Sequence, residues 1–401
     1  MLGALAIAAG AFTLVPPNAL GPTWLLVLLA LVAFGWMLLR PRGVDRDNTI
    51  PAIAVVLASL GLFTIARISP DLAHKQEIWL AISLVLAVIA GPAFDRYRVL
   101  APYKYIWILG TIALFVMLAI FGQEVNGAKL WIRFGTVQFE PVEVIKLLVV
   151  LFMASYLAET ADVIAHTRPW SLRANAKYLG PLFIGWGASM AILVFERDLG
   201  MAALLLCTFA AMLYVATRRV DLIVGCFAVF GIFAYWAATH YRYIHTRIEV
   251  WQHPFADPLG AGYQPLQALF SLGAGGLFGT GYRLGHPGFI PEVATDYSYA
   301  AWSEELGALG AIVVCIAFLV IVSRALTIAM RQPDLYTKLL ATGLASTLGF
   351  QVLIIIGGVL RLFPLTGITL PFFSYGGSSL LTNFLLIALV WSISSERRAA
   401  A

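Results

Sequence analysis

The sequence predicts an all-α, polytopic membrane protein with about twelve transmembrane helices. Of its 401 residues, 61% are hydrophobic and only 12% are charged, and the mean hydropathy is +0.87. Soluble domains typically carry about 25% charged residues. The apolar runs recur at a length of roughly 20 residues, which a helix needs to cross a hydrocarbon core ~30 Å thick.

We expect the spans at residues 2–15, 19–39, 50–69, 77–93, 103–121, 141–158, 180–195, 199–216, 220–238, 301–323, 339–361 and 375–394. The first two form an N-terminal transmembrane hairpin within 1–45, and the other ten form a core within 46–401. The first run lacks a basic n-region, and Pro16 and Pro17 follow it. A helix is therefore favoured over a signal peptide there.

Basic residues gather in alternate connections, as the positive-inside rule requires of cytoplasmic loops. Both termini are therefore predicted to be cytoplasmic, and the loops at 122–140, 239–300 and 362–374 to face outward. The rule also explains the net charge of +5, so no nucleic-acid partner is expected. Sixteen of the 26 Lys and Arg residues lie in these cytoplasmic connections: Arg40, Arg42, Arg46, Arg96, Arg98, Lys104, Arg168, Arg173, Lys177, Arg218, Arg219, Arg324, Arg331, Lys338, Arg397 and Arg398.

The large outer loop at 239–300, before the tenth span, is too aromatic and too rich in glycine for a disordered linker. Long ordered loops are usually functional. We expect short helices on the membrane surface there, joined by glycine turns. The loop at 122–140 is amphipathic, and Trp131 and Phe134 should lie at the level of the lipid headgroups.

Ionisable side chains at membrane depth are costly and mark functional sites by default. Glu143 and Lys146 are three residues apart on one predicted helix, so they share a face and can pair. The pair could be interfacial and lock helix packing, or buried and line a cavity. Glu196, Arg197 and Asp198 fill a tight outward connection, either as a solvated turn or as part of an outer site.

The stretch 291–310, PEVATDYSYAAWSEELGALG, places four carboxylates before an apolar run that starts near Gly307. Glu304 and Glu305 suit the N-terminus of that helix, where the macrodipole favours negative charge. Asp296 lies several residues before the helix, beyond simple capping reach. It is therefore the candidate for chemistry.

The segment 364–381, PLTGITLPFFSYGGSSLL, interrupts the apolar pattern with prolines, glycines and paired serines. Irregular backbone at membrane depth is tolerated where it lines a cavity. Gly376, Gly377, Ser378 and Ser379 would open a helix whose backbone N–H groups could face an anion such as a phosphate.

Four blocks together resemble the family of shape, elongation, division and sporulation (SEDS) proteins, whose best-known members are RodA and FtsW. They are NGAKLWIRFGTVQFEPVEVIK at 126–146, FERDLG at 195–200, the long block from GAGYQPLQALFSLGAGGLFGTG at 260–281 through IPEVATDYSYAAWSEELG at 290–307, and PLTGITLPFFSYGGSS at 364–379. The resemblance covers roughly residues 50–395 and implies the ten-helix core of that family, to which 1–45 adds a hairpin.

The resemblance implies a peptidoglycan glycosyltransferase in the cytoplasmic membrane. Such an enzyme polymerises lipid II at the outer face and releases undecaprenyl diphosphate. It also implies a class B penicillin-binding protein, a transpeptidase, as partner, together with other membrane proteins of the elongation or division machinery. A divalent cation, Mg²⁺ or Mn²⁺, is expected as cofactor.

The resemblance also assigns roles to residues of this chain. Asp296 matches the family's essential aspartate and is the expected base, as well as a candidate ligand of the cation. Glu143 and Lys146 match a functionally important pair, and Asp198 matches a further acidic position. Other expected residues of the substrate cavity lie within the matching blocks: Arg133, Gln264, Gln267, Glu292, Glu305, Ser374, Gly376, Gly377, Ser378 and Ser379.

Two readings from other classes compete with a polymerase. Intramembrane charges and a broken helix also suit a transporter that flips lipid II. A scaffold for wall-synthesis enzymes is the third reading, and it leaves the clustered acids without a role. The short C-terminal tail is compatible with a role in elongation and with a role in division.

The predicted topology can be tested by labelling. Pro258→Cys should react with an impermeant thiol reagent in intact cells, because the charge asymmetry puts 239–300 outside. Arg218→Cys, in a predicted cytoplasmic turn, is the matched control and should stay unlabelled until the membrane is opened. Labelling of Arg218→Cys with protection of Pro258→Cys would invert the topology.

Overall fold

The computed structural model divides the chain into two compact units. The first comprises the described residues of Met1–Asp95, Thr246–Arg324 and Gln351–Arg398, and the second those of Arg96–His245, Ala325–Phe350 and Ala399–Ala401. The structure describes residues 24–39, 46–125, 128–134, 137–167, 177–180, 182, 187 and 198–395.

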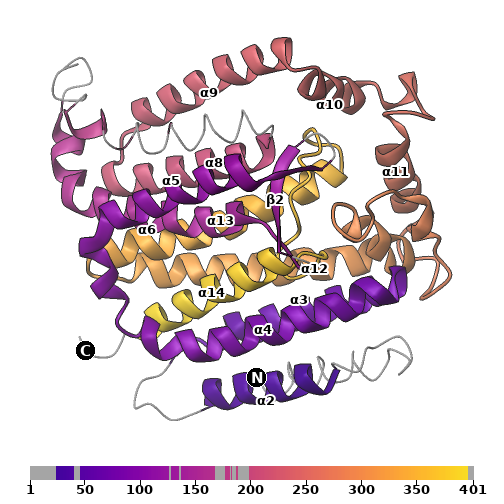
Figure 1. Ribbon diagram of the computed structural model, residues 1–401, viewed down its shortest axis with the longest axis horizontal. Helices are drawn as coiled ribbons and strands as arrows, with labels where there is room; N and C mark the ends of the chain where they lie inside the picture. Colours follow the sequence, from indigo (N-terminus) through magenta and orange to yellow (C-terminus); the bar gives the residue numbers. More distant parts are fainter. Residues whose placement is uncertain are drawn as a thin grey trace. The chain divides into compact units, whose positions relative to one another are not determined.

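Helices make up most of the described chain (Figure 1). Eight segments among the described residues are long and apolar enough to cross a membrane: α3 (Thr49–Ile68), α4 (Pro70–Phe94), η1 with α5 (Tyr97–Phe121), α6 (Pro141–His166), α8 (Leu199–Thr217), α9 (Val220–His240), α12 (Ser298–Met330) and α13 (Leu335–Val359). Two apolar helices are shorter, α2 (Trp24–Leu39) and α14 (Gly377–Ile393). The protein is therefore a multi-pass membrane protein, and the helical fold class is confirmed.

Ten predicted spans correspond to these helices. The predicted spans at 2–15 and, for most of its length, 180–195 lie outside the described residues. So does much of the predicted hairpin at 1–45, of which the structure describes α2.

In the first unit α4 is the central helix. It packs against α14, α2 and α3, and α14 also contacts α3. The sequence fixes where α4 begins: the Ser69 side chain accepts a hydrogen bond from the Leu72 amide, and Pro70 occupies the first helical turn. Both features are favoured at a helix N-terminus.

The irregular segment between α13 and α14 returns into the first unit. The amide of the fully buried Gln351 donates to the Thr369 carbonyl at 2.9 Å. A Cβ on Gly61 would lie 2.3 Å from the Phe373 carbonyl oxygen, so the two backbones are in close contact. Gln351 and Gly61 each lie about two turns before the end of their helix. The segment therefore contacts each helix roughly 10 Å along the helix axis from its C-terminal end.

In the second unit α6 packs against α5 and α8. Between α5 and α6 the chain forms a three-stranded antiparallel sheet of β1 (Gln123–Val125), β2 (Ala128–Phe134) and β3 (Val137–Phe139), in the order β1-β2-β3. The sequence analysis expected an amphipathic loop at 122–140 and missed these strands. Their hydrogen bonds satisfy the backbone of a segment that has no helical pattern.

The loop at 239–300 contains short helices. They are α10 (Arg242–Gln252), η2 (Pro254–Ala256), α11 (Tyr263–Gly275) and η3 (Pro287–Phe289). Glycines at positive φ follow α11, at Gly276, Gly279 and Gly281. The prediction of glycine turns in this loop is therefore confirmed.

The start of α12 corrects one expectation. The helix begins at Ser298, and Gly307 interrupts it with φ 70° and ψ −172°. The amides of Ala308 and Leu309 donate to the carbonyls of Gly276 and Leu277 instead of to the preceding turn. Glu304 and Glu305 therefore end a short first part of α12, and they do not cap the N-terminus of the spanning part.

The contact at Gly61 predicts a large effect of a single methyl group. Gly61→Ala should lower the free energy of unfolding by about 1–3 kcal/mol, because the new Cβ meets backbone that cannot rotate away. Gly225→Ala on α9 is the matched control, since nothing lies within 4 Å of its Cβ position. Thermal melting in detergent measures both; equal melting temperatures would refute the close packing.

Candidate active site

The acidic stretch before α12 is a tight turn that fixes Asp296 by its backbone. The Asp296 amide donates to the Glu292 carbonyl at 3.1 Å, and the Thr295 hydroxyl donates to the same oxygen at 3.1 Å. Glu292 itself has φ 50°, in the left-handed region that side chains rarely occupy. Asp296 lies only two residues before the start of α12, closer to a helix than the sequence suggested.

The Arg247 guanidinium and the backbone of Gly367 lie beside the Asp296 side chain. A Cβ built on Gly367 would be 3.8 Å from Asp296 Oδ2 and 3.4 Å from Arg247 Nη2. Arg247 projects from α10 and donates through Nη1 to the Leu365 carbonyl at 3.0 Å. Asp296, Arg247 and Gly367 therefore meet at one place in the first unit, and Gly367 adds no side chain in front of the carboxylate.

The surroundings of Asp296 favour proton transfer near neutral pH. Burial raises the pKa of its carboxyl group to about 6, and the nearby charge of Glu292 adds to the rise. The Arg247 charge and the Thr295 hydrogen bond act in the opposite direction. The side chain nevertheless keeps some exposure to solvent. A carboxylate with such a pKa can act as a general base, if the acceptor hydroxyl comes within hydrogen-bond reach.

The turn before α14 is bonded to the acidic stretch. The Tyr375 amide donates to the Ala294 carbonyl at 2.8 Å, and the hydroxyls of Ser374 and Ser298 lie 2.7 Å apart. The Ser374 hydroxyl also accepts from the Leu370 amide at 3.1 Å. The structure thus brings two of the predicted site segments together, because Ser298 is the first residue of α12.

The N-terminus of α14 is covered by side chains of α4. Gln76 accepts from the Gly376 amide and donates to the Ser374 carbonyl, both at 3.3 Å. A Cβ on Gly377 would lie 2.3 Å from the Trp79 indole. Ser378 and Ser379 are buried. The amide of Gly376, the residue before the helix, faces Gln76, and the proposed role of this turn in anion binding stays a prediction.

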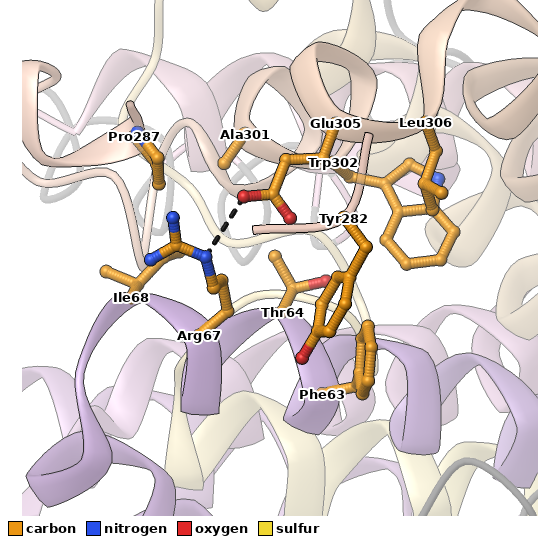
Figure 2. A pocket seen from close by; sticks show the side chains of 10 residues that line it. All are labelled: Phe63, Thr64, Arg67, Ile68, Tyr282, Pro287, Ala301, Trp302, Glu305 and Leu306. Atoms are coloured by element: carbon orange, nitrogen blue, oxygen red, sulfur yellow. Dashed lines mark hydrogen bonds and ion pairs between the residues drawn. The ribbon is translucent and has the colours of Figure 1, made fainter. Parts of the chain in front are cut away.

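Glu305 and Arg67 form an ion pair in the lining of a pocket that is partly open to solvent. Arg67 Nε donates to Glu305 Oε1 at 3.1 Å (Figure 2). The rings of Phe63, Tyr282 and Trp302 form other walls of this pocket. The neighbouring Glu304 accepts from the His286 amide at 2.9 Å.

The two predicted glutamines lie on α11. Gln264 donates to the Pro291 carbonyl at 2.9 Å and so holds the beginning of the acidic stretch. Gln267 is half-buried on the same helix. Glu292 is exposed.

Four predicted site residues belong to the second unit: Arg133, Glu143, Lys146 and Asp198. Asp198 is buried and caps α8, where its Oδ1 accepts from the Met201 amide at 3.0 Å. Arg133 is exposed on β2, opposite Gln138 in register. Glu196 and Arg197 lie outside the described residues.

Glu143 and Lys146 form an ion pair at the start of α6, as their spacing predicted. Glu143 is 1% exposed and Lys146 is 0% exposed, so the pair is buried. Within the second unit the charge of each group is thus compensated by the other.

Sequence reasoning missed Arg67, Arg247 and Gln76. Each contacts a segment more than a hundred residues away, so no local spacing announced it. A signal did exist for Arg67: it is a cation in the last turn of an otherwise apolar span, a position that calls for a partner.

These observations define a helical, multi-pass membrane protein with a carboxylate-centred site on the segment before α12. The family profile described as "Cell cycle protein" (FtsW/RodA/SpoVE) matches residues 48–399. The chain therefore belongs to the SEDS family, and the resemblance of its sequence blocks is confirmed.

Curated relatives agree with this assignment. The chain is 34% identical over 390 residues to the peptidoglycan glycosyltransferase RodA of Mycobacterium tuberculosis, covering 93% of this chain and 83% of that protein. It is 31% identical over 377 residues to the probable peptidoglycan glycosyltransferase FtsW of Coxiella burnetii, covering 87% and 96%. It is also 35% identical over 281 residues to stage V sporulation protein E of Bacillus subtilis, covering 69% and 74%.

Solved structures show the same fold. A chain from a study of how a peptidoglycan synthase complex coordinates polymerisation and crosslinking matches with a TM-score of 0.72 and 26% identity, covering 88% of this chain and 99% of that one. The rod shape determining protein RodA of Thermus thermophilus matches with a TM-score of 0.63 and 26% identity, covering 89% and 99%.

The buried pair on α6 predicts non-additive mutational effects. Glu143→Gln or Lys146→Met alone should destabilise the protein by about 3–5 kcal/mol, because each leaves the other charge buried without its partner. The double substitution should recover most of that loss. Thermal melting of the four proteins in detergent gives the coupling free energy, and additive losses would contradict a direct pairing.

Proposed function

We propose that this chain is a peptidoglycan glycosyltransferase that polymerises lipid II and releases undecaprenyl diphosphate. The relatives named peptidoglycan glycosyltransferase support the reaction class, at 34% and 31% identity over most of the chain. The observation that carries the proposal for the site is the partly buried Asp296 beside Arg247 and the bare backbone of Gly367.

In the proposed reaction the acceptor hydroxyl oxygen of one glycan unit attacks the anomeric carbon of another. A new glycosidic bond forms as the bond between that carbon and the lipid diphosphate breaks. Asp296 takes the hydroxyl proton, and the diphosphate leaves with the bonding electron pair. The pKa of Asp296, raised to about 6, keeps the carboxylate largely ionised at neutral pH while it remains basic enough to accept a proton.

The leaving diphosphate requires positive charge. We propose Glu143 with Lys146, and the turn at 374–379, as candidates for this task. The structure adds Arg247, whose guanidinium lies beside Asp296 in the first unit. Arginine suits phosphate oxygens because its fork of donors matches their geometry.

A divalent cation, Mg²⁺ or Mn²⁺, stays part of the proposal. In the part of the chain that the structure describes, no three His, Cys, Asp or Glu side chains stand together as metal ligands. Mg²⁺ commonly takes one or two protein carboxylates together with substrate phosphates, and Asp296 with a bound diphosphate fits that pattern. The cation would neutralise charge on the diphosphate.

The distribution of basic residues supports an outer-face site. We place both termini in the cytoplasm and the Asp296 segment at the outer face of the cytoplasmic membrane, where it can meet lipid II whose chain stays in the bilayer. A class B penicillin-binding protein is the proposed partner. Similarity to a chain from a peptidoglycan synthase complex supports a partner of this kind.

A lipid II flippase is the second candidate, favoured by the buried charged pair of α6. The two functions are separated by one assay on purified protein in detergent. A polymerase makes glycan polymer from lipid II without any membrane, whereas a flippase makes none.

The proposed base predicts a loss of activity without a loss of fold. Asp296→Asn should keep normal thermal stability and lower lipid II polymerisation by about 10²–10⁴-fold, the usual cost of removing a positioned base. Asp257→Asn is the matched control. Asp257 is an exposed aspartate of the same outer loop whose Oδ1 accepts from the Gly260 amide and whose Oδ2 accepts from the Ala261 amide. The Asn oxygen keeps one of these two turn bonds, so the control removes a carboxylate of this loop away from the proposed base.

Polymerisation is measured from labelled lipid II on gels, and stability by thermal melting. If Asp296→Asn retained more than about a tenth of wild-type activity, the base would have to lie elsewhere. Glu292, four residues earlier, would be the next candidate.

A further inference from the structure

We infer that Arg67 is a positioning residue: its ion pair with Glu305 and its bonds to the loop at 283–285 hold the Asp296 segment against the end of α3. The reaction that this positioning serves rests on the proposed function. The latch itself, defined as Arg67, Glu305 and the turn at 282–285, rests on contacts within the first unit.

One face of α3 makes all the contacts of the latch. Phe63 and Arg67 are four residues apart and so lie on the same face of that helix. The Phe63 ring stacks on Tyr282 with centroids 4.6 Å apart. Figure 2 shows the Arg67 guanidinium directed at the Glu305 carboxylate, with the two rings beside it.

Arg67 also bonds to backbone that needs external support. Its Nη2 donates to the carbonyls of Gly285 at 3.1 Å and of Arg283 at 3.4 Å. Arg283 has φ 65°, a left-handed conformation that is strained for a non-glycine residue. Such a turn persists when contacts with the rest of the protein stabilise it, and the hydrogen bonds from the Arg67 guanidinium are part of that stabilisation.

The latch is bonded to both ends of the segment that carries Asp296. At one end, the turn at 282–285 leads to η3 and the acidic stretch. At the other, Glu305 belongs to the first part of α12, which begins two residues after Asp296. The Gly281 and Thr280 amides donate to the carbonyls of Glu305 and Glu304, which ties the two ends together.

The ion pair is partly withdrawn from water, which makes it more than a surface contact. The Glu305 side chain is 8% exposed and the Arg67 side chain 25%. Loss of Arg67 would leave the Glu305 carboxylate in a confined place at the C-terminal end of a short helix, where the macrodipole disfavours negative charge. The turn and the first part of α12 would then relax, and Asp296 would move with them.

The test compares Arg67→Ala with Arg67→Lys and with a control at the other end of α3. Arg46→Ala breaks the Arg46–Asp95 ion pair, which has a distance of 2.8 Å and an arginine side chain that is 7% exposed. Hydrogen exchange of peptides covering 280–297 reports the latch, and lipid II polymerisation reports the reaction. We expect Arg67→Ala to speed exchange of 280–297 and to lower kcat roughly 10- to 100-fold, with KM little changed.

Arg67→Lys keeps the charge and should recover part of both effects, whereas Arg46→Ala should alter neither. Unchanged exchange of 280–297 in Arg67→Ala would overturn the latch. Faster exchange with wild-type kcat would overturn the positioning role. A wild-type protein that makes no polymer would instead overturn the proposed function, and the exchange result would still decide the latch.

Discussion

The absence of water inside a bilayer is the constraint on which the first unit depends. Each backbone N–H and C=O at that depth needs a partner from the protein. The helices satisfy their own, but the segment between α13 and α14 has no regular structure and still descends between them. Polar side chains of the helices therefore complete its hydrogen bonds: Gln351 reaches Thr369, and Gln76 reaches both Ser374 and Gly376. Glycines permit the approach, since a Cβ at Gly61 or Gly377 would overlap its neighbours.

The charged side chains of the two units differ in their burial and in their partners. Glu143 and Lys146 are buried and compensate each other's charge on one helix. Asp296 keeps some contact with solvent and faces a cation from another helix, Arg247. Burial and Arg247 act on its pKa in opposite directions, and the balance leaves the value near 6. A carboxylate buried as deeply as Glu143 could not meet an acceptor hydroxyl, whereas one fully in water would be a weak base.

The sequence predicted the spanning helices well because a run of about 20 apolar residues has the length and the composition of a helix that crosses the hydrocarbon core. It predicted the α6 ion pair for the same kind of reason, since a spacing of three residues fixes a shared helical face. Both inferences are local. The strands at 123–139 were also locally encoded, because Asn126-Gly127 between β1 and β2 is a strong hairpin signal. The expectation of an all-helical membrane protein leaves no place for such a hairpin.

What could not be predicted depends on contacts between distant segments. The break at Gly307 arises because carbonyls of Gly276 and Leu277 replace the helical partners of two amides, and no pattern within α12 announces it. The same holds for Arg247 on Leu365 and for Arg67 on Glu305. A single sequence lists these residues without saying which of them meet.

The break at Gly307 also separates two tasks that one continuous helix would combine. Beyond Gly307, α12 is a spanning helix with exposed apolar side chains such as Leu309, Ile312 and Ile316. Before Gly307, its short first part takes its orientation from α3, from the 276–287 loop and from the turn before α14. Asp296 is attached to this first part, so its position is set by polar contacts at the ends of several helices and not by the tilt of the spanning helix. Those contacts come from three distant regions of the chain. The acidic stretch alone could therefore indicate the base but not the residues that hold it in place.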